Sequence, residues 1–95
     1  MRTIIPSNQF KRELRLMRRR GLDIAKLQAV IDQLADDSVL DDSLRDHPLV
    51  GNYKGFRECH IEPNWLLIYR KEDDEALELH ELLLARTGTH SDLFE

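Results

Sequence analysis

A stretch near the start of the chain carries apolar residues at helical spacing. Phe10, Leu14 and Met17 recur at i, i+4 and i+7, which is the spacing of one helix face. Ser7 stands before this run and can cap it, and Gly21 follows it. The pattern therefore predicts a helix between Ser7 and Gly21. Its opposite arc carries five cations, Lys11, Arg12, Arg15, Arg18 and Arg19.

A second apolar stripe predicts a second helix. Asp23 can cap it, and its apolar face consists of Ile24, Leu27, Val30, Ile31 and Leu34. Only Gly21-Leu22 separates the two helices, so they are expected to form a helical hairpin. A short apolar segment at 3–5 precedes them, and Pro6 stops it from pairing further as a strand.

The period changes in the second half of the chain. Segments 56–61 and 65–70 are rich in residues that favour strands, and the turn sequence at 62–64 separates them, so a hairpin is predicted. Segment 41–48 is polar and acidic, with Pro48 biasing His47 away from helix, and is interpreted as a loop. Segment 75–86 is ambiguous: its composition favours helix, yet several apolar positions fall on one strand face, namely Leu77, Leu79, Leu83 and Ala85.

Length and composition narrow the class of protein. Ninety-five residues make one domain, 1–95, and 41% hydrophobic with 34% charged residues is a globular balance. The longest apolar run, Trp65 to Tyr69, is much shorter than the ~20 residues needed to cross a membrane. The N-terminus shows no secretory signal pattern, and one cysteine cannot form an internal disulfide. We therefore expect a cytoplasmic protein with no membrane partner.

Charge is distributed unevenly along the chain. The net charge is −4, but residues 1–20 carry +6, 21–46 carry −5, 47–71 carry +2 and 72–95 carry −7. A protein that met nucleic acid with its whole surface should be basic overall, so the total argues against generic binding. It leaves room for a local basic face at the start of the chain.

Three histidines lie in polar segments bounded by turns: His47, His60 and His90. Such positions often carry function, although solvated loop histidines remain the alternative. His80 alternates with leucines and is interpreted as structural. Cys59 and His60 would point to opposite faces of a strand, and no two ligands share a zinc-motif spacing. Neither a metal, a cofactor nor a cysteine nucleophile is therefore predicted.

Metal-free RNA cleavage would suit these side chains. It needs a base for the ribose 2′-OH, an acid for the leaving 5′-oxygen and cations for the phosphate. The histidines could supply the first two, and Lys54, Arg57 and Arg86 the third. The alternatives are a solvated strand for Lys54 and Arg57 and a surface ion pair for Arg86.

Several separated runs resemble the YafQ branch of the RelE-like toxins, in order and at compatible spacing. They cover most of residues 46–94: Asp46-His47-Pro48-Leu49, Gly51, Tyr53-Lys54-Gly55-Phe56-Arg57, His60 to Tyr69, and Arg86 to Phe94. The N-terminal half matches only in its outline of a strand and two helices.

The resemblance implies an α+β fold in which two N-terminal helices pack on a small, mostly antiparallel sheet, with segment 75–86 mostly strand. It also implies a toxin of a type II toxin–antitoxin pair that enters the ribosomal A site and cuts translated mRNA. The implied partner is a DNA-binding antitoxin of the DinJ/RelB-like kind, through which alone the toxin would meet DNA.

The same resemblance implies roles for particular residues. His47, His60 and His90 would share acid–base work and phosphate contacts, with Glu58 in the catalytic group and Arg86 as a phosphate clamp. Phe94 would stack on a base, with Lys54, Arg57 and Asn64 as further substrate contacts. The five cations of the first helix would contact the antitoxin or ribosomal RNA.

Two departures from the family pattern affect this interpretation. Where the family has aspartates, this chain has Glu58, which keeps the carboxylate, and Asn64, which loses it. The family also tends to be basic, whereas this chain totals −4. The alternative is therefore a catalytically weakened relative that acts mainly as an antitoxin-binding corepressor or an RNA-binding module.

Overall fold

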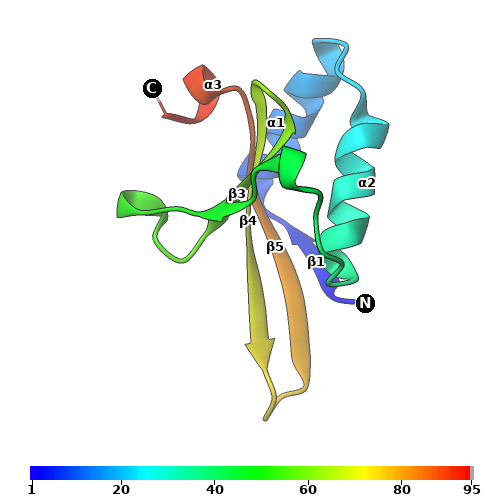
Figure 1. Ribbon diagram of the computed structural model, residues 1–95, viewed down its shortest axis with the longest axis vertical. Helices are drawn as coiled ribbons and strands as arrows, with labels where there is room; N and C mark the ends of the chain where they lie inside the picture. Colours follow the sequence, from blue (N-terminus) through cyan, green and yellow to red (C-terminus); the bar gives the residue numbers. More distant parts are fainter. Residues whose placement is uncertain (95) are drawn as a thin grey trace.

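A five-stranded sheet with helices on both faces organises residues 1–94, which the computed structural model describes (Figure 1). The strand order is β1-β5-β4-β3-β2; β1 runs parallel to β5 and the other pairs are antiparallel. This confirms the α+β class. The elements are β1 (Thr3–Pro6), α1 (Asn8–Arg19), α2 (Ile24–Ala35), the 3-10 turn η1 (Asp42–Leu44), β2 (His47–Pro48), the 3-10 turn η2 (Gly51–Tyr53), β3 (Arg57–Glu62), β4 (Trp65–Asp74), β5 (Leu79–Gly88) and α3 (His90–Phe94).

The two predicted helix starts are confirmed by their caps. The Ser7 hydroxyl accepts a hydrogen bond from the Phe10 N–H at 2.9 Å, and the Asp23 carboxylate accepts one from the Ala25 N–H at 3.1 Å. Each satisfies a backbone donor that the first helical turn leaves unpaired. Gly21, at a φ of 82°, then turns the chain from α1 towards α2.

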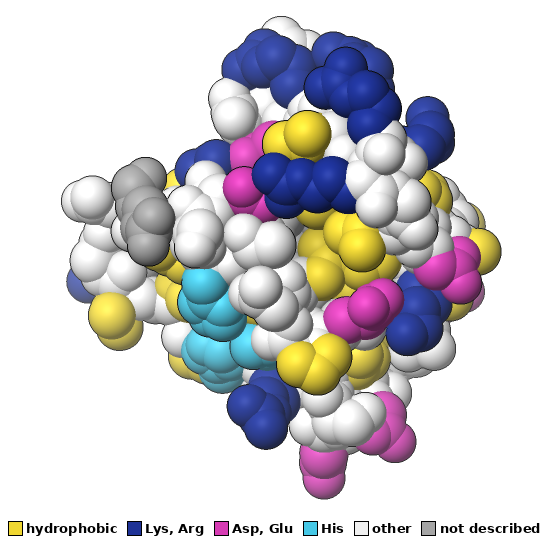
Figure 2. Space-filling model, turned by 90° about the horizontal axis from the view of Figure 1, so that it is seen from above, with side chains coloured by type: hydrophobic (Ala, Val, Ile, Leu, Met, Phe, Trp, Pro, Cys, Tyr) yellow, Lys and Arg dark blue, Asp and Glu magenta, His cyan; other side chains and the backbone are white. Residues whose placement is uncertain are grey.

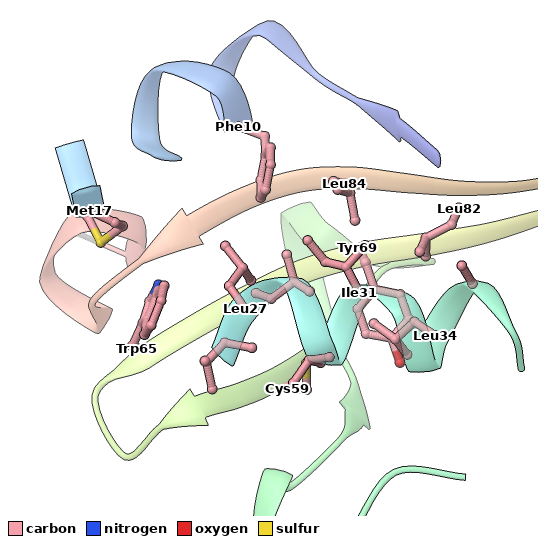
Figure 3. Close-up of a cluster of buried hydrophobic side chains, with 14 residues drawn as sticks. Phe10, Met17, Leu27, Ile31, Leu34, Cys59, Trp65, Tyr69, Leu82 and Leu84 are labelled. Atoms are coloured by element: carbon pink, nitrogen blue, oxygen red, sulfur yellow. The ribbon is translucent and has the colours of Figure 1, made fainter. Parts of the chain in front are cut away.

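The main core lies between the sheet and the pair α1 and α2 (Figure 3). Leu27, Ile31 and Leu34 of α2 meet Leu67 and Tyr69 of β4 in this layer. Trp65 is also buried, and its indole N–H donates to the Thr87 hydroxyl at 2.9 Å, so its polar atom is satisfied inside the core. No helix within residues 1–94 has both the length and the apolar character needed to cross a bilayer.

A smaller apolar cluster covers the other face of the sheet. Leu66, Ile68 and Leu93 are buried there, with Tyr53 and Phe56 packed against them. This layer holds α3 and η2 against the sheet. Because side chains alternate along a strand, β3 directs Cys59 and Ile61 into the helix-side core and Glu58 and His60 to this second face.

Segment 79–88 is a strand, so the helix that its composition favours is wrong and the strand implied by the resemblance is confirmed. β5 pairs with β4 along its whole length and with β1 on its other edge. These long-range pairings override the local preference of leucine and glutamate for helix. Leu82 and Leu84 are buried, whereas Leu77 and Leu79 are exposed where the β4–β5 hairpin extends beyond the body (Figure 1).

The loop interpretation of residues 41–48 is wrong in part. The segment forms η1 and then β2, in which His47 lies opposite Glu58 and Pro48 opposite Arg57. β2 is the edge of the sheet, where the missing N–H of a proline is tolerated. This pairing brings His47 next to β3.

Candidate active site

Histidine side chains gather on one face of the molecule (Figure 2). Three of them, from three segments, form a row of neighbouring rings. His47 comes from β2, His60 from β3 and His90 from the start of α3. The ring centroids of His47 and His60 lie 6.3 Å apart, and those of His60 and His90 lie 5.9 Å apart. All three were candidate site residues, and the fold brings them together.

His47 is held through both ring nitrogens. Its Nδ1–H donates to the Arg45 carbonyl at 2.6 Å, and its Nε2 lies 2.9 Å from Glu58 Oε2. Glu58 is only 4% exposed, and its other oxygen, Oε1, is buried without a hydrogen-bond partner. Both ring nitrogens therefore face hydrogen-bond acceptors, and the two contacts fix the orientation of the imidazole.

The other two histidines have freer rings. His60 Nδ1 lies 3.3 Å from the Pro63 carbonyl, a contact that favours the tautomer with a proton on Nδ1. In that neutral tautomer Nε2 is a hydrogen-bond acceptor. His90 contributes its backbone N–H to Asn64 Oδ1 at 3.4 Å. Asn64, which the resemblance suggests as a substrate contact, thus makes its polar contact with the backbone of His90.

Aromatic rings continue the row beyond His90. The Phe94 ring lies 5.9 Å from the ring of His90 and 6.0 Å from that of Tyr53, in an edge-on arrangement with Tyr53. Phe94 remains 45% exposed, so part of its face is open beside the histidines. Sequence reasoning assigned no role to Tyr53, although it stands in the Tyr53-to-Arg57 run quoted for the resemblance.

A network of polar contacts fixes α3, which carries His90 and Phe94. Asp92 accepts a hydrogen bond from the Thr89 N–H at 2.9 Å and pairs with Arg20, from the end of α1, at 2.7 Å. The Arg20 guanidinium holds the pKa of Asp92 well below its usual range. This short helix is therefore tied to α1 as well as to the sheet.

Arg86, a candidate phosphate clamp, is engaged by protein groups. Its guanidinium donates to both carboxylate oxygens of Glu13 on α1 and, at 3.0 Å, to the Tyr53 hydroxyl. Glu13 is buried and raises the pKa of Arg86 above its already high value. Arg86 is thus in an ion pair, as in the alternative considered from the sequence, but its partner is buried and not at the surface.

The remaining candidate cations lie away from one another. The Arg57 side chain lies on the helix side of the sheet, opposite to His60, and its Nε is 3.2 Å from Asp46. Lys54 is exposed directly after η2. The five cations of α1 are all exposed, and basic side chains gather at one edge of the face that carries the histidines (Figure 2).

Cys59 lies apart from the histidine row. It is fully buried on the helix side of β3, and burial raises the pKa of its thiol to about 12. A thiol with so high a pKa stays protonated at neutral pH, so it is a poor nucleophile and a poor metal ligand. Within the described residues, no group of three or more His, Cys, Asp or Glu side chains is placed to hold a metal ion.

This sheet and its two covering helices define a RelE-like toxin fold. Comparisons with known proteins show to which family of these toxins the chain belongs. The model of the family described as a bacterial toxin of type II toxin–antitoxin system, YafQ, matches residues 2–95. The mRNA interferase toxin YafQ of Escherichia coli strain K12 is 37% identical over 94 residues, which cover 98% of this chain and 96% of the relative.

Solved structures agree with this match. The crystal structure of YafQ from E. coli strain BL21(DE3) has a TM-score of 0.88 at 35% identity, and the E. coli DinJ–YafQ complex has a TM-score of 0.86 at 36% identity; each covers 100% of both chains. The chain belongs to the YafQ family of type II toxin–antitoxin toxins, whose E. coli members are named mRNA interferases, a class of endoribonuclease.

Proposed function

We propose that this chain is a ribosome-dependent mRNA endoribonuclease that cuts translated mRNA in the A site without a metal ion. The observation that carries the proposal is the row of three histidine rings, with neighbouring centroids about 6 Å apart, joined at one end by a half-exposed phenylalanine. The names of the E. coli relatives support the RNA substrate. Translated mRNA places the reaction in the cytoplasm.

The reaction is a transfer of the phosphate within the RNA chain. The ribose 2′-oxygen loses its proton to a base and attacks the neighbouring phosphorus, and the 5′-oxygen of the next nucleotide leaves with a proton from an acid. The products are a 2′,3′-cyclic phosphate and a free 5′-hydroxyl. Groups on both sides of one phosphate are needed, and the histidine row is long enough to flank it.

The hydrogen bonds of the rings suggest how the three histidines divide this work. His60 donates from Nδ1 and leaves its Nε2 lone pair to accept the 2′-OH proton. His90 serves as the acid at the leaving oxygen. His47, held between the Arg45 carbonyl and Glu58, acts as a fixed cation that stabilises charge on the phosphate.

Other candidate residues fit this scheme to different degrees. Phe94 would stack on a base next to the cut, and Tyr53 would hold the Phe94 ring edge-on. Arg86 would position Tyr53 through its hydroxyl rather than clamp the phosphate, since Glu13 already neutralises it. Arg57 lies across the sheet and has no part in the scheme.

The test is induced expression followed by mapping of mRNA 5′ ends. Wild type should produce new 5′ ends within translated reading frames, and His60→Gln and His90→Ala should each abolish them. His80→Gln is the matched control, because His80 is exposed on the β4–β5 hairpin beside Asp73 and far along the sheet from the row. Equal cleavage by wild type and His90→Ala would refute the proposed site.

A cognate antitoxin is the second partner we propose, because the similar toxin of E. coli was crystallised with DinJ. The exposed cations of α1 would meet either an acidic segment of that antitoxin or ribosomal RNA. Because Asn64 lacks a carboxylate, it favours a second candidate function, in which cleavage is weak and antitoxin binding is the main role. Toxicity on expression without the antitoxin separates the two cases.

A further inference from the structure

A hollow opens beside the histidine row. It has a volume of about 360 Å³, within the size range of small-molecule sites. His60 forms one wall, and α2, η1 and the β3–β4 turn supply the others, so the hollow touches the row at its middle ring. The residues that matter for its chemistry are Lys26, Ser43, Arg45, His60, Glu62 and Pro63.

The hollow has an unbalanced positive charge. Lys26 lies 3.6 Å from Glu62, and both side chains are well exposed, so this pair is weak. No carboxylate within residues 1–94 lies at ion-pair distance from the guanidinium of Arg45. An anion would therefore find in Arg45 a partner that the protein itself has not used.

The backbone of Arg45 connects this hollow to the site. Arg45 has a φ of 50°, in the left-handed region that few residues other than glycine, asparagine and aspartate adopt. Its carbonyl accepts the proton of His47 Nδ1 at 2.6 Å. One residue thus orients a ring of the row through its backbone and also lines the hollow.

We propose that this hollow is a second nucleotide subsite, which holds the residue of the RNA on the other side of the cut from the one stacked on Phe94. Arg45 pairs with the phosphate next to the cleaved one, and Pro63 and Ser43 contact the sugar and base. The row supports this order, because His90 adjoins Phe94 whereas His60 adjoins the hollow. This inference rests on the proposed RNA substrate.

Arg45→Asn tests the inference with little disturbance of the fold, because asparagine tolerates a positive φ and keeps the carbonyl that holds His47. Its matched control is Lys71→Asn, which removes a cation of β4 that pairs with Asp37 and has no part in the proposed site. Each protein is given two RNAs with a 2′-deoxy residue at the cut position, so that they cannot be cleaved. In one of the two RNAs, the phosphate next to the cleaved one, which Arg45 is proposed to bind, is replaced by a neutral methylphosphonate.

Equilibrium binding is measured by fluorescence anisotropy. In wild type and Lys71→Asn the methylphosphonate should weaken binding about tenfold, the effect of losing one charge-assisted hydrogen bond. In Arg45→Asn it should make no difference, because the partner of that phosphate is already gone. Equal sensitivity in Arg45→Asn and Lys71→Asn, or no sensitivity in any protein, overturns the subsite.

Cleavage of the same RNAs without the 2′-deoxy residue, measured on programmed ribosomes, separates this inference from the proposed function. Arg45→Asn should raise the toxin concentration needed for half-maximal cleavage and leave the maximal rate within about twofold, as expected for lost uniform binding. A wild type that binds with the predicted sensitivity but cuts no mRNA would refute the nuclease and leave the subsite standing.

Discussion

The resemblance implies a carboxylate where this chain has Asn64, whose side chain accepts the backbone N–H of His90. Asn64→Asp would keep this contact and add a negative charge next to the backbone of His90, the residue that we propose as the acid. A carboxylate favours the protonated imidazole, so we expect faster cleavage, with the largest gain on the alkaline side of the pH profile. Single-turnover cleavage on programmed ribosomes across pH measures this.

Asn8→Asp, at the exposed start of α1, is the control for an added charge elsewhere. It should leave the pH profile unchanged. Identical rates and profiles for wild type and Asn64→Asp would make Asn64 a turn residue with no catalytic consequence.

Phe94 is expected to serve substrate binding more than stability. Because it is 45% exposed, Phe94→Ala should cost about 1–2 kcal/mol in the free energy of unfolding, below the 3–5 kcal/mol typical of a buried phenylalanine. Cleavage should fall about tenfold or more through lost stacking. Phe94→Leu, which keeps apolar volume without the ring, should restore the stability and leave cleavage low; a larger stability loss in Phe94→Ala would assign this ring to the core.

Residue type and position in the sequence were enough to identify many of the candidate site residues. The direction in which each side chain points could be predicted only in part. The histidines were identified because they stand in turn-bounded polar segments. Arg57 was grouped with them, yet alternation from the buried Cys59 and Ile61 places it on the helix side. The proposed role of Tyr53 depends on a contact with Arg86, 33 residues away, and that of Arg45 on a left-handed backbone that its residue type does not favour. Neither feature has a signal in the local sequence.

At the level of elements, one buried carboxylate links α1 to β5. Glu13 on α1 accepts from the guanidinium of Arg86 and from the Thr87 N–H. Glu13→Gln keeps the shape but leaves the half-buried guanidinium without a counter-charge, so we expect a loss of about 1–3 kcal/mol in the free energy of unfolding. Urea denaturation monitored by the Trp65 fluorescence measures it.

The double variant Glu13→Gln/Arg86→Met provides the cross-check. Removing both partners of a buried pair costs less than removing one. The double variant should therefore lose less free energy of unfolding than the two single variants, Glu13→Gln and Arg86→Met, lose in total. Strict additivity would show that the two side chains do not interact in the folded protein.

Elements with strong local signals were predicted from the residues alone, whereas β2 was missed and only the resemblance identified β5 as a strand. α1 and α2 follow from apolar periodicity and from the caps Ser7 and Asp23. β2 consists of two residues, too short for any period, and exists only because β3 offers it an edge. β5 required knowledge of β1 and β4, since its own leucines and glutamates favour helix.

On the scale of the whole molecule, Asp37 joins the N-terminus to β4. Its carboxylate accepts hydrogen bonds from Arg2 and Lys71, which lower its pKa from 3.8 to about 2. A lowered pKa stabilises the fold above the unfolded value near pH 4, and that stabilisation disappears as the pH falls towards 2. Wild type should therefore lose stability between pH 4 and 2.

Asp37→Asn should be less stable than wild type at pH 7 and should show a shallower loss across this acid range, so that the two proteins converge near pH 2. Thermal unfolding followed by circular dichroism at several pH values measures this. Asp36→Asn, at the neighbouring exposed position, should track wild type. Parallel curves for wild type and Asp37→Asn would show that these ion pairs do not persist in solution.

Charge is separated across the molecule, with cations along α1 and carboxylates on the β4–β5 hairpin. Reversing two charges of the arc, Arg15→Glu and Arg18→Glu together, should weaken binding to the ribosome or to the antitoxin. For an RNA partner, the dependence of log affinity on log salt should fall by about two. The control Glu75→Lys/Glu78→Lys, at the hairpin turn, should not reduce either affinity; unchanged affinities and salt slopes for the Arg15 and Arg18 reversal would make the arc a solvated face.

The pairing of β1 with β5 has a consequence for the synthesis of the protein. Residues 3–6 leave the ribosome first, yet their partner strand spans residues 79–88, and His90 and Phe94 come later still. The sheet cannot close, and the histidine row cannot be complete, on a nascent chain whose residues 79–94 are still inside the exit tunnel. Under the proposed function, a ribosome translating this toxin is therefore not exposed to its activity until almost the whole chain has emerged, which leaves an antitoxin time to capture the newly folded molecule.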